Sequence, residues 1–306
     1  MRIGFGLPHH GVRVSPENIV AVAERAETVG YDSLWTLDRV IKTIDFTTPY
    51  PGSEDGSLGE QYDTVYEHLT VLTYVAALTS RIRLGVSVLN LPLYQPVLLA
   101  KRLATLDQLS GGRLIVGLGA GWSEDEFAAA GGDFRRRGAV ADDYLGAMKA
   151  LWKEDEVEYR GRFVEIRRSV FGPKPRQEPH PPLLMGAFSA RALARAATAA
   201  DGFMGCCAPV GTLLSFRRRM EEAAEAAGRR VDALQSIIRC NVHLQEEALP
   251  DESRPFGSGT FAQVRDDVLR LRDAGVDEVF FDIYHQTHLT RGDEVRQFEQ
   301  FRGILG

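Results

Sequence analysis

Apolar side chains alternate between two spacings along the chain. In residues 82–88 they recur at every second position and include β-branched residues, which indicates a strand, whereas in residues 97–109 they recur at helical spacing. Prolines break the chain before this helix, and a Ser-Gly-Gly run at 110–112 ends it before a further apolar strand at 113–119. The stretch is therefore a strand-helix-strand unit, which joins two parallel strands.

The same alternation continues through the sequence and gives eight strand-helix pairs. Eight alternations favour an α/β fold of the (β/α)8 TIM barrel type over an open sheet, and 306 residues suit such a barrel as a single domain covering 1–306. We predict strands at 2–7, 33–37, 82–88, 113–119, 183–187, 202–206, 236–244 and 278–283, and helices at 16–29, 69–76, 97–109, 141–152, 189–199, 210–227, 261–274 and from 293.

Two segments interrupt this alternation. Residues 38–62 are rich in Pro and Gly and have no clear period, so we predict an extended loop after strand 2 that lies over the barrel mouth as a lid. Residues 157–182 alternate weakly and contain many Arg and Pro, which indicates an insertion between strands 4 and 5 that includes a hairpin. The loops that follow barrel strands are where we expect the chemistry.

Composition narrows the classes of partner. With 36 basic against 42 acidic residues and a net charge of -6, the chain has no general basic field for nucleic acid or an anionic membrane. Three cysteines without Cys-x-x-Cys spacing indicate buried structural thiols and neither a disulfide framework nor a metal site. The N-terminus lacks a signal-peptide pattern and no apolar run has membrane-spanning length, so we expect a cytoplasmic protein that acts on a small molecule.

Several polar residues stand where strands of the predicted barrel end. Asp38 and Arg39 follow strand 2, where a rim salt bridge is the alternative to a functional role. His9 and His10 follow strand 1; a catalytic role for either competes with simple solvation. The other histidines, including His285, show no metal-ligand spacing.

Two glycine-containing turns are candidate anion sites. Residues 117–122 end strand 4 and contain three glycines, although tight turning explains them equally well. The turn Gly186-Ala187-Phe188-Ser189 ends strand 5 and opens a helix, whose free amides attract an anion. Ser189 as a plain helix cap is the alternative.

Five segments of the sequence resemble one known family. They are YDSLWTLD at 31–38, LGVSVL at 84–89, PVLLAK at 96–101, LDQLSGGR at 106–113 and the stretch 117–127. These segments make the chain similar to the luciferase-like monooxygenase superfamily of flavin and deazaflavin enzymes, and weaker similarity continues to about residue 203. The pattern most resembles the branch that uses the deazaflavin coenzyme F420, with FMN-dependent relatives as the alternative.

The resemblance implies where the cofactor would bind. Asp38 would approach the deazaflavin ring, and Ser87-Val88 would form a bulge with a non-proline cis peptide against it. Gly121 and its loop with Asp125 would line the ribityl and phosphate portion together with the turn Gly186, Ala187, Phe188 and Ser189. The resemblance also implies a homodimer.

Two departures from the family pattern change the expected reaction. Arg39 stands where dehydrogenases of the F420 branch have a His that exchanges a proton, and an Arg stays protonated at neutral pH. Phe188-Ser189 replaces the Gly-Gly of the anion turn, which leaves less room for the backbone to approach a phosphate. Arg39 could instead bind an anionic substrate or polarise a carbonyl.

We therefore predict an F420-dependent oxidoreductase that transfers a hydride to an activated C=C or C=O bond. Trp122, Tyr50 and Tyr62 would line the substrate pocket, with Asp38, Arg39 and His9 as candidate catalytic residues; Tyr50, Glu60 and Tyr62 are possible proton donors. An FMN-dependent monooxygenase supplied by a separate flavin reductase is the alternative. A flavin- or deazaflavin-binding protein without catalysis is a further one.

Overall fold

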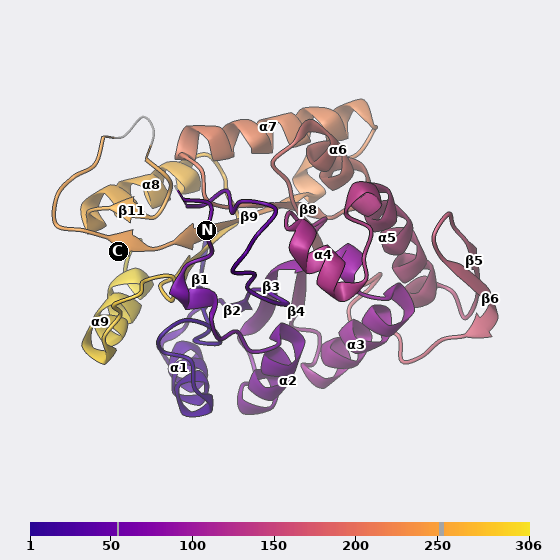
Figure 1. The fold of residues 1–306 in the computed structure, drawn as a ribbon, viewed down its shortest axis with the longest axis horizontal. Coiled ribbons are helices and arrows are strands. Elements are labelled where there is room, and N and C mark those ends of the chain that lie inside the picture. The colour runs from indigo at the N-terminus through magenta and orange to yellow at the C-terminus, as the bar shows by residue number, and fades with distance from the viewer. Residues whose placement is uncertain (54, 251–253) are drawn as a thin grey trace.

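Eight parallel strands close into a barrel in the computed structural model, which describes residues 1–53, 55–250 and 254–306 (Figure 1). The order around the barrel is β1-β2-β3-β4-β7-β8-β9-β12, and β12 pairs with β1 to close it. The predicted (β/α)8 TIM barrel is confirmed. The barrel strands are β1 (Arg2–Gly6), β2 (Ser33–Thr36), β3 (Arg83–Asn90), β4 (Leu114–Gly119), β7 (Leu183–Gly186), β8 (Gly202–Gly205), β9 (Gln235–Asn241) and β12 (Glu278–Asp282).

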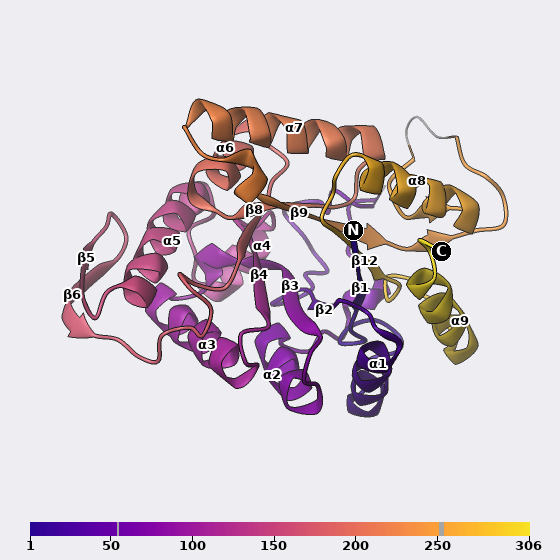
Figure 2. The same ribbon diagram turned by 180° about the vertical axis from the view of Figure 1, so that it is seen from behind.

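Helices surround the barrel, as the front and back views show (Figures 1 and 2). The local signals in the sequence explain several of their ends: Ser15 accepts a hydrogen bond from the Asn18 amide at 3.1 Å, and Gly30 closes the same helix with φ 86°. The helices are α1 (Pro16–Val29), α2 (His68–Leu78), α3 (Pro96–Leu109), α4 (Glu124–Ala130), α5 (Arg137–Lys153), α6 (Ala190–Ala199), α7 (Val210–Ala226), α8 (Phe261–Asp273) and α9 (Arg291–Arg302), with 3-10 turns at Glu60–Tyr62, Leu91–Leu93, Phe134–Arg136 and Val231–Ala233.

A layer of large side chains fills the barrel interior. Trp35 stacks on Phe280 with ring centroids 4.6 Å apart, and both are buried. On the side of the strand N-termini, buried Glu278 accepts a hydrogen bond from Trp35 Nε1 at 3.2 Å and also binds Arg83. The interior is therefore packed, which leaves the C-terminal mouth as the place for a ligand.

The insertion between β4 and β7 contains the expected hairpin. β5 (Glu156–Arg160) pairs antiparallel with β6 (Glu165–Val170), and the hairpin projects beside α5, away from the barrel (Figure 1). The predicted strand 236–244 is wrong at its end. The barrel strand stops at Asn241, and β10 (His243–Leu244) pairs instead with β11 (Ser258–Gly259) outside the barrel.

None of the helices in the described part of the chain is both long and apolar enough to cross a membrane.

Candidate active site

A cavity of about 500 Å³ lies at the C-terminal mouth of the barrel. Its wall is mostly apolar, with a few polar groups, which is typical of small-molecule sites. Nine of the residues chosen from the sequence line it: Asp38, Arg39, Tyr50, Tyr62, Ser87, Val88, Trp122, Gly186 and Phe188.

Asp38 is a structural anchor as well as a lining residue. One carboxylate oxygen accepts a hydrogen bond from the Asn90 amide at 2.9 Å, and the other accepts one from the Tyr94 hydroxyl at 2.8 Å. His68 Nδ1 lies 3.4 Å from the second oxygen. Asp38 therefore joins the ends of β2 and β3 to α2 and fixes the shape of the mouth.

Arg39 is held in a buried ion pair. Its Nη1 lies 2.8 Å from Glu126 Oε2 on α4, and its guanidinium lies over Tyr62 and Trp122, 5.3 Å and 5.2 Å from the ring centroids. A salt bridge at the rim was the alternative to a functional role for Arg39, and this salt bridge is present. Arg39 also lines the cavity. Arg39 orients the aromatic wall of the cavity.

β3 carries the expected irregularity beside the cavity. Its register against β4 shifts between Val86 and Leu89, and the Ser87-Val88 peptide is cis. The glycines around Val88 make room for it, because a Cβ on Gly119 would come within 2.8 Å of a Val88 methyl.

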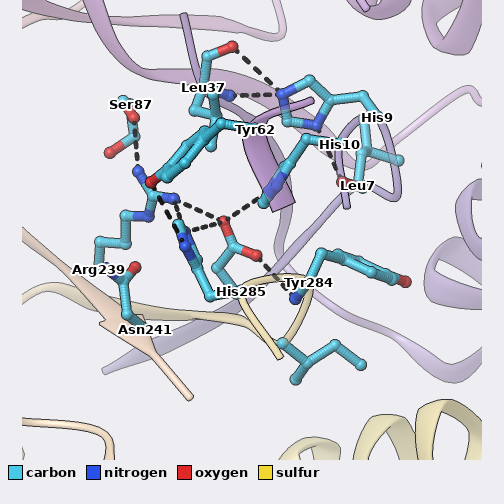
Figure 3. A network of polar contacts seen from close by, with 12 residues as sticks. Leu7, His9, His10, Leu37, Tyr62, Ser87, Arg239, Asn241, Tyr284 and His285 are labelled. Atoms are coloured by element: carbon cyan, nitrogen blue, oxygen red, sulfur yellow. Dashed lines mark hydrogen bonds and ion pairs between the residues drawn. The ribbon is translucent and has the colours of Figure 1, made fainter. Parts of the chain in front are cut away.

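The structure does not bring His9 to the cavity. Its Nδ1 donates to the Leu7 carbonyl at 2.9 Å, and its Nε2 accepts from the Leu37 amide at 2.9 Å (Figure 3). Burial and the neighbouring His10 lower the pKa of His9 to about 3. The ring is neutral and bound on both sides, so His9 supports the ends of β1 and β2 and has no proton to exchange with a ligand.

Four residues predicted to bind the cofactor do not line the cavity. Asp125 accepts hydrogen bonds from the amides of Thr47 and Thr48 at 3.0 to 3.2 Å, so its carboxylate is used to hold the loop after β2. Ser189 caps α6, because its hydroxyl oxygen accepts a hydrogen bond from the Ala192 amide at 3.3 Å. The alternative prediction, that Ser189 is a plain helix cap, is confirmed. Ala187 is buried in the core, and Gly121 packs against Phe127.

A polar cluster that sequence reasoning did not bring together reaches the cavity through Arg239; Figure 3 shows its contacts. Arg239 Nη2 donates to Asp282 Oδ2 at 2.7 Å and to His285 Nε2 at 2.5 Å, while Nη1 donates to the Ser87 carbonyl at 3.1 Å. His10 Nε2 lies 3.3 Å from the same Asp282 oxygen. We call these four side chains (Arg239, Asp282, His10, His285) the polar cluster.

The charges of the polar cluster follow from its contacts. Burial by itself would raise the pKa of Asp282, but His10, His285 and Arg239 outweigh it and hold this pKa well below its usual range. Burial lowers the pKa of His285 to about 4 against the opposing effect of Asp282. His285 is therefore neutral, and because Arg239 can only donate, His285 Nε2 is the acceptor and Nδ1 carries the proton.

That tautomer connects the polar cluster to Tyr62. His285 Nδ1 lies 3.4 Å from the Tyr62 hydroxyl, which is on the cavity wall. Nδ1 then donates to the Tyr62 oxygen, which leaves the Tyr62 hydroxyl hydrogen for another acceptor; Tyr50, whose ring centroid lies 6.1 Å from that of Tyr62, lines the same cavity. Burial raises the pKa of Tyr62 well above its ordinary value, so the group stays protonated.

His10, Asp282 and His285 are also a set of metal-ligating types, with one atom of each within 4.8 Å of the others. The Arg239 guanidinium already binds both Asp282 and His285. A permanent positive charge at that place opposes a second cation, so the cluster favours an anionic or carbonyl group over a metal ion.

The buried neutral histidines give a pH-dependent stability. In the unfolded chain both His9 and His285 protonate near pH 6.5, but in the folded chain only near pH 3 and 4. The unfolded state therefore binds more protons as the pH falls through 6.5, and folding is weakened. As the pH is lowered from 7.5 to 5, we expect the free energy of unfolding to fall by about 2 kcal/mol for each of these two histidines. The measurement is a guanidinium titration at each pH.

A variant with His9→Gln should show a smaller loss over this range. Replacing exposed His288 by Gln is the matched control and should leave the loss unchanged. Equal pH slopes in the parent and the His9→Gln protein would contradict the burial argument.

The prediction of three buried thiols is confirmed for Cys240 alone and is wrong for the other two. Cys240 is buried, but Cys206 is half-buried and Cys207 is exposed, and both of these line the cavity beyond the end of β8. A loop between a strand and a helix brings them to the mouth, which the spacing of cysteines does not reveal.

Residues 1–257 match the model of the luciferase-like monooxygenase family. The chain belongs to this family. The resemblance found in the sequence is thereby confirmed, and the superfamily contains both F420- and FMN-dependent enzymes, as the relatives below show.

Relatives of this chain include an F420-dependent enzyme and an FMNH(2)-dependent enzyme. An uncharacterised protein of Mycobacterium tuberculosis is 38% identical over 168 residues, which cover 55% of this chain and 59% of that protein. The F420-dependent glucose-6-phosphate dehydrogenase of Amycolatopsis mediterranei is 30% identical over 230 residues (73% and 64%). The FMNH(2)-dependent dimethylsulfone monooxygenase of Pseudomonas putida is 31% identical over 144 residues (46% and 39%).

A solved structure agrees with the fold of this luciferase-like protein over its whole length. The monooxygenase RslO1 from Streptomyces bottropensis superposes with a TM-score of 0.79, covering 100% of this chain and 98% of that one, at 22% identity. This similarity concerns the fold alone.

Proposed function

We propose that the protein is an F420-dependent oxidoreductase that delivers a hydride to an activated C=C or C=O bond of a small organic substrate. The observation that carries the proposal is a largely apolar cavity of about 500 Å³ with a buried guanidinium and a tyrosine hydroxyl at one end. The family supports a flavin or deazaflavin cofactor. The relative that depends on F420 supports F420 as the cofactor within this class.

The cavity residues suit a flat ring system with polar edges. Val88, Met204 and Trp122 supply apolar surface. In the described part of the chain, the side-chain atoms on the cavity wall that are buried without a hydrogen-bond partner include Arg39 Nε, Arg239 Nε and Asn241 Oδ1. A donor and an acceptor left free beside an apolar surface match the carbonyl and N-H groups on the edge of a flavin or deazaflavin.

The cofactor would supply the hydride, and the chain's own residues would do the rest. Asp38 fixes the mouth through the Asn90 amide, and the pair of Arg39 with Glu126 holds Trp122 and Tyr62 against the cavity. These rings keep water from the reacting atoms. Tyr62 holds a proton directed away from His285, where it can be given to a substrate atom that gains negative charge.

Reduction is favoured over alcohol oxidation because the polar end of the cavity offers hydrogen-bond donors and a protonated tyrosine. A base that removes a proton from an alcohol must be unprotonated, whereas Arg239 and Tyr62 both carry protons at neutral pH. The Asp38 carboxylate also lines the cavity, but its two oxygens already accept from the Asn90 amide and the Tyr94 hydroxyl. An electron-rich carbonyl oxygen near Arg239 and Tyr62 is stabilised as charge develops on it.

The cofactor is tested by titrating the purified protein with F420 and, separately, with FMN, and following fluorescence. We expect micromolar or tighter binding of F420 and at least tenfold weaker binding of FMN. The reverse preference would replace the proposal by an FMN-dependent monooxygenase, for which the dimethylsulfone monooxygenase relative is the argument. Oxygen consumption with reduced FMN would then identify that activity.

A non-catalytic binding protein is the remaining outcome. Tight F420 binding without hydride exchange, across a panel of enones, ketones and imines, would favour it. Binding of neither cofactor would overturn the proposal altogether.

A further inference from the structure

Two adjacent cysteines line the cavity where β8 ends. Cys206 is half-buried and Cys207 exposed, and both are free thiols. Cys240, in β9, is buried in the core. The chain therefore carries two accessible thiols side by side and a third that is shielded, which provides its own internal comparison.

The backbone at Cys207 has an uncommon conformation. Its φ is 55°, and among the residues that the structure describes no other non-glycine residue has a positive φ. Such a conformation costs about 1 kcal/mol or more for a side chain other than Gly or Asn, and it tends to occur at functional sites. It sets the Cys207 side chain on the cavity wall, next to Asn241.

The surroundings of Cys207 favour its thiolate form. The neighbouring Cys206 thiol, helped by the charge of Arg239, lowers the pKa of Cys207 to about 7. Asn241 Nδ2 donates to the Cys207 sulfur from 3.2 Å. The neighbouring Cys207 and burial raise the pKa of Cys206, and only Cys207 receives the amide hydrogen bond, so the two thiols are unequal.

We propose that Cys207 is a peroxide-reactive thiol and that Cys206 is its resolving partner. The site is made of a nucleophilic sulfur on the cavity wall, the Asn241 amide that donates a hydrogen bond to it, a second thiol next to it in the chain and a guanidinium on the wall of the same cavity. Its ligand class is a peroxide, either hydrogen peroxide or an organic hydroperoxide. This inference does not depend on the proposed function, because it needs neither the cofactor nor the substrate.

The chemistry takes two balanced steps. The Cys207 thiolate attacks one oxygen of the peroxide, so an S–O bond forms, the O–O bond breaks and water or an alcohol leaves with a proton from solvent; sulfur is oxidised to a sulfenic acid and the peroxide is reduced. The Cys206 sulfur then attacks Cys207, an S–S bond forms, and the S–O bond breaks. The proton of Cys206 leaves with the hydroxide as a second water.

The disulfide made in this way would be easily reduced. Adjacent Cα atoms are about 3.8 Å apart across a trans peptide, which is below the usual span of a disulfide of roughly 4.4 to 6.8 Å. A disulfide under strain has a higher reduction potential than a relaxed one. The site is therefore a reversible modification site, and the modification changes the cavity wall.

The test uses the reduced full chain with one equivalent of hydrogen peroxide or of cumene hydroperoxide at pH 6.5. The oxidation of each cysteine is followed by differential alkylation and mass spectrometry. We expect Cys207 to react at least threefold faster than in the chain unfolded in urea, because more of it is thiolate. The product should be a disulfide between Cys206 and Cys207, reversed by dithiothreitol, with Cys240 still reduced.

Two variants separate the roles of the two thiols. With Cys206→Ser, oxidation should stop at a sulfenic acid that dimedone traps on Cys207; with Cys207→Ser, Cys206 should react no faster than in the unfolded chain. Cys240→Ala is the control and should change neither result. Equal rates for Cys207 in the folded and unfolded chains, no dimedone adduct in Cys206→Ser, or a product joining Cys207 to Cys240 would each overturn the proposal.

Discussion

Replacing Arg239 by Met should destabilise the folded protein by about 3 to 5 kcal/mol. The substitution removes the one permanent cation of the polar cluster and leaves the Asp282 carboxylate, which is 5% exposed, with two histidines of which His285 is neutral. The carbonyl of Ser87 also loses its donor. The measurement is the free energy of unfolding from guanidinium titration at pH 7.5.

The cause of this loss can be isolated with a second substitution. Asp282→Asn removes the buried charge, so the double variant Arg239→Met with Asp282→Asn should recover at least half of the lost free energy. Arg25→Met breaks the exposed pair with Glu299 and should cost less than about 1 kcal/mol. A loss for Arg239→Met as small as that of Arg25→Met would show that Asp282 needs no partner.

Replacing Tyr62 by Phe should slow hydride transfer by about 10² to 10⁴ fold while cofactor binding changes little. The substitution keeps the ring that lies under Arg39 and removes only the hydroxyl that His285 contacts. This expectation rests on the proposed function. The measurement is the single-turnover oxidation of reduced cofactor by an acceptor found in the substrate panel, followed by stopped flow.

Tyr66→Phe is the control for this prediction. Tyr66 is partly exposed and does not line the cavity, so the rate of hydride transfer in the Tyr66→Phe protein should match that of the parent. His285→Gln should give an intermediate loss, since Tyr62 then lacks the imidazole N-H behind it. A Tyr62→Phe protein that keeps more than half of the parent rate would remove Tyr62 from the proposed mechanism.

Local signals in the sequence predicted the barrel well because they act over short distances. Pro16, Ser15 and Gly30 define α1 through contacts within the helix itself. The apolar runs of β3 and β4 are buried on both sides, and that leaves a clear pattern. The end of β9 was mispredicted because apolar Val242 follows Asn241 without a break, although the chain there leaves the barrel.

Part of the site could also be predicted from the sequence, where residues lie next to a strand end. Asp38, Arg39 and the Ser87-Val88 bulge follow from such positions together with the family pattern. Asp125 and Ser189 are near the mouth as well, but hydrogen bonds from backbone amides use their polar atoms. Proximity to a strand end does not say which way a side chain points.

The polar cluster could not be predicted, because its members are far apart along the chain. Arg239 and Asp282 lie on the paired strands β9 and β12 but are 43 residues apart in the sequence. His10 and His285 follow two different strands, and each alone has the appearance of a solvated loop histidine. Only the pairing of β12 with both β1 and β9 brings these side chains together.

The contacts of α4 restrict how this protein can acquire a new specificity. Asp125 and Glu126 hold the loop after β2 through the amides of Thr47, Thr48 and Val40. That loop supplies much of the cavity wall, so its length cannot change without losing these supports. A loop transplanted from a relative would therefore have to be exchanged together with α4, so that the two segments behave as a single unit in any redesign of the cavity.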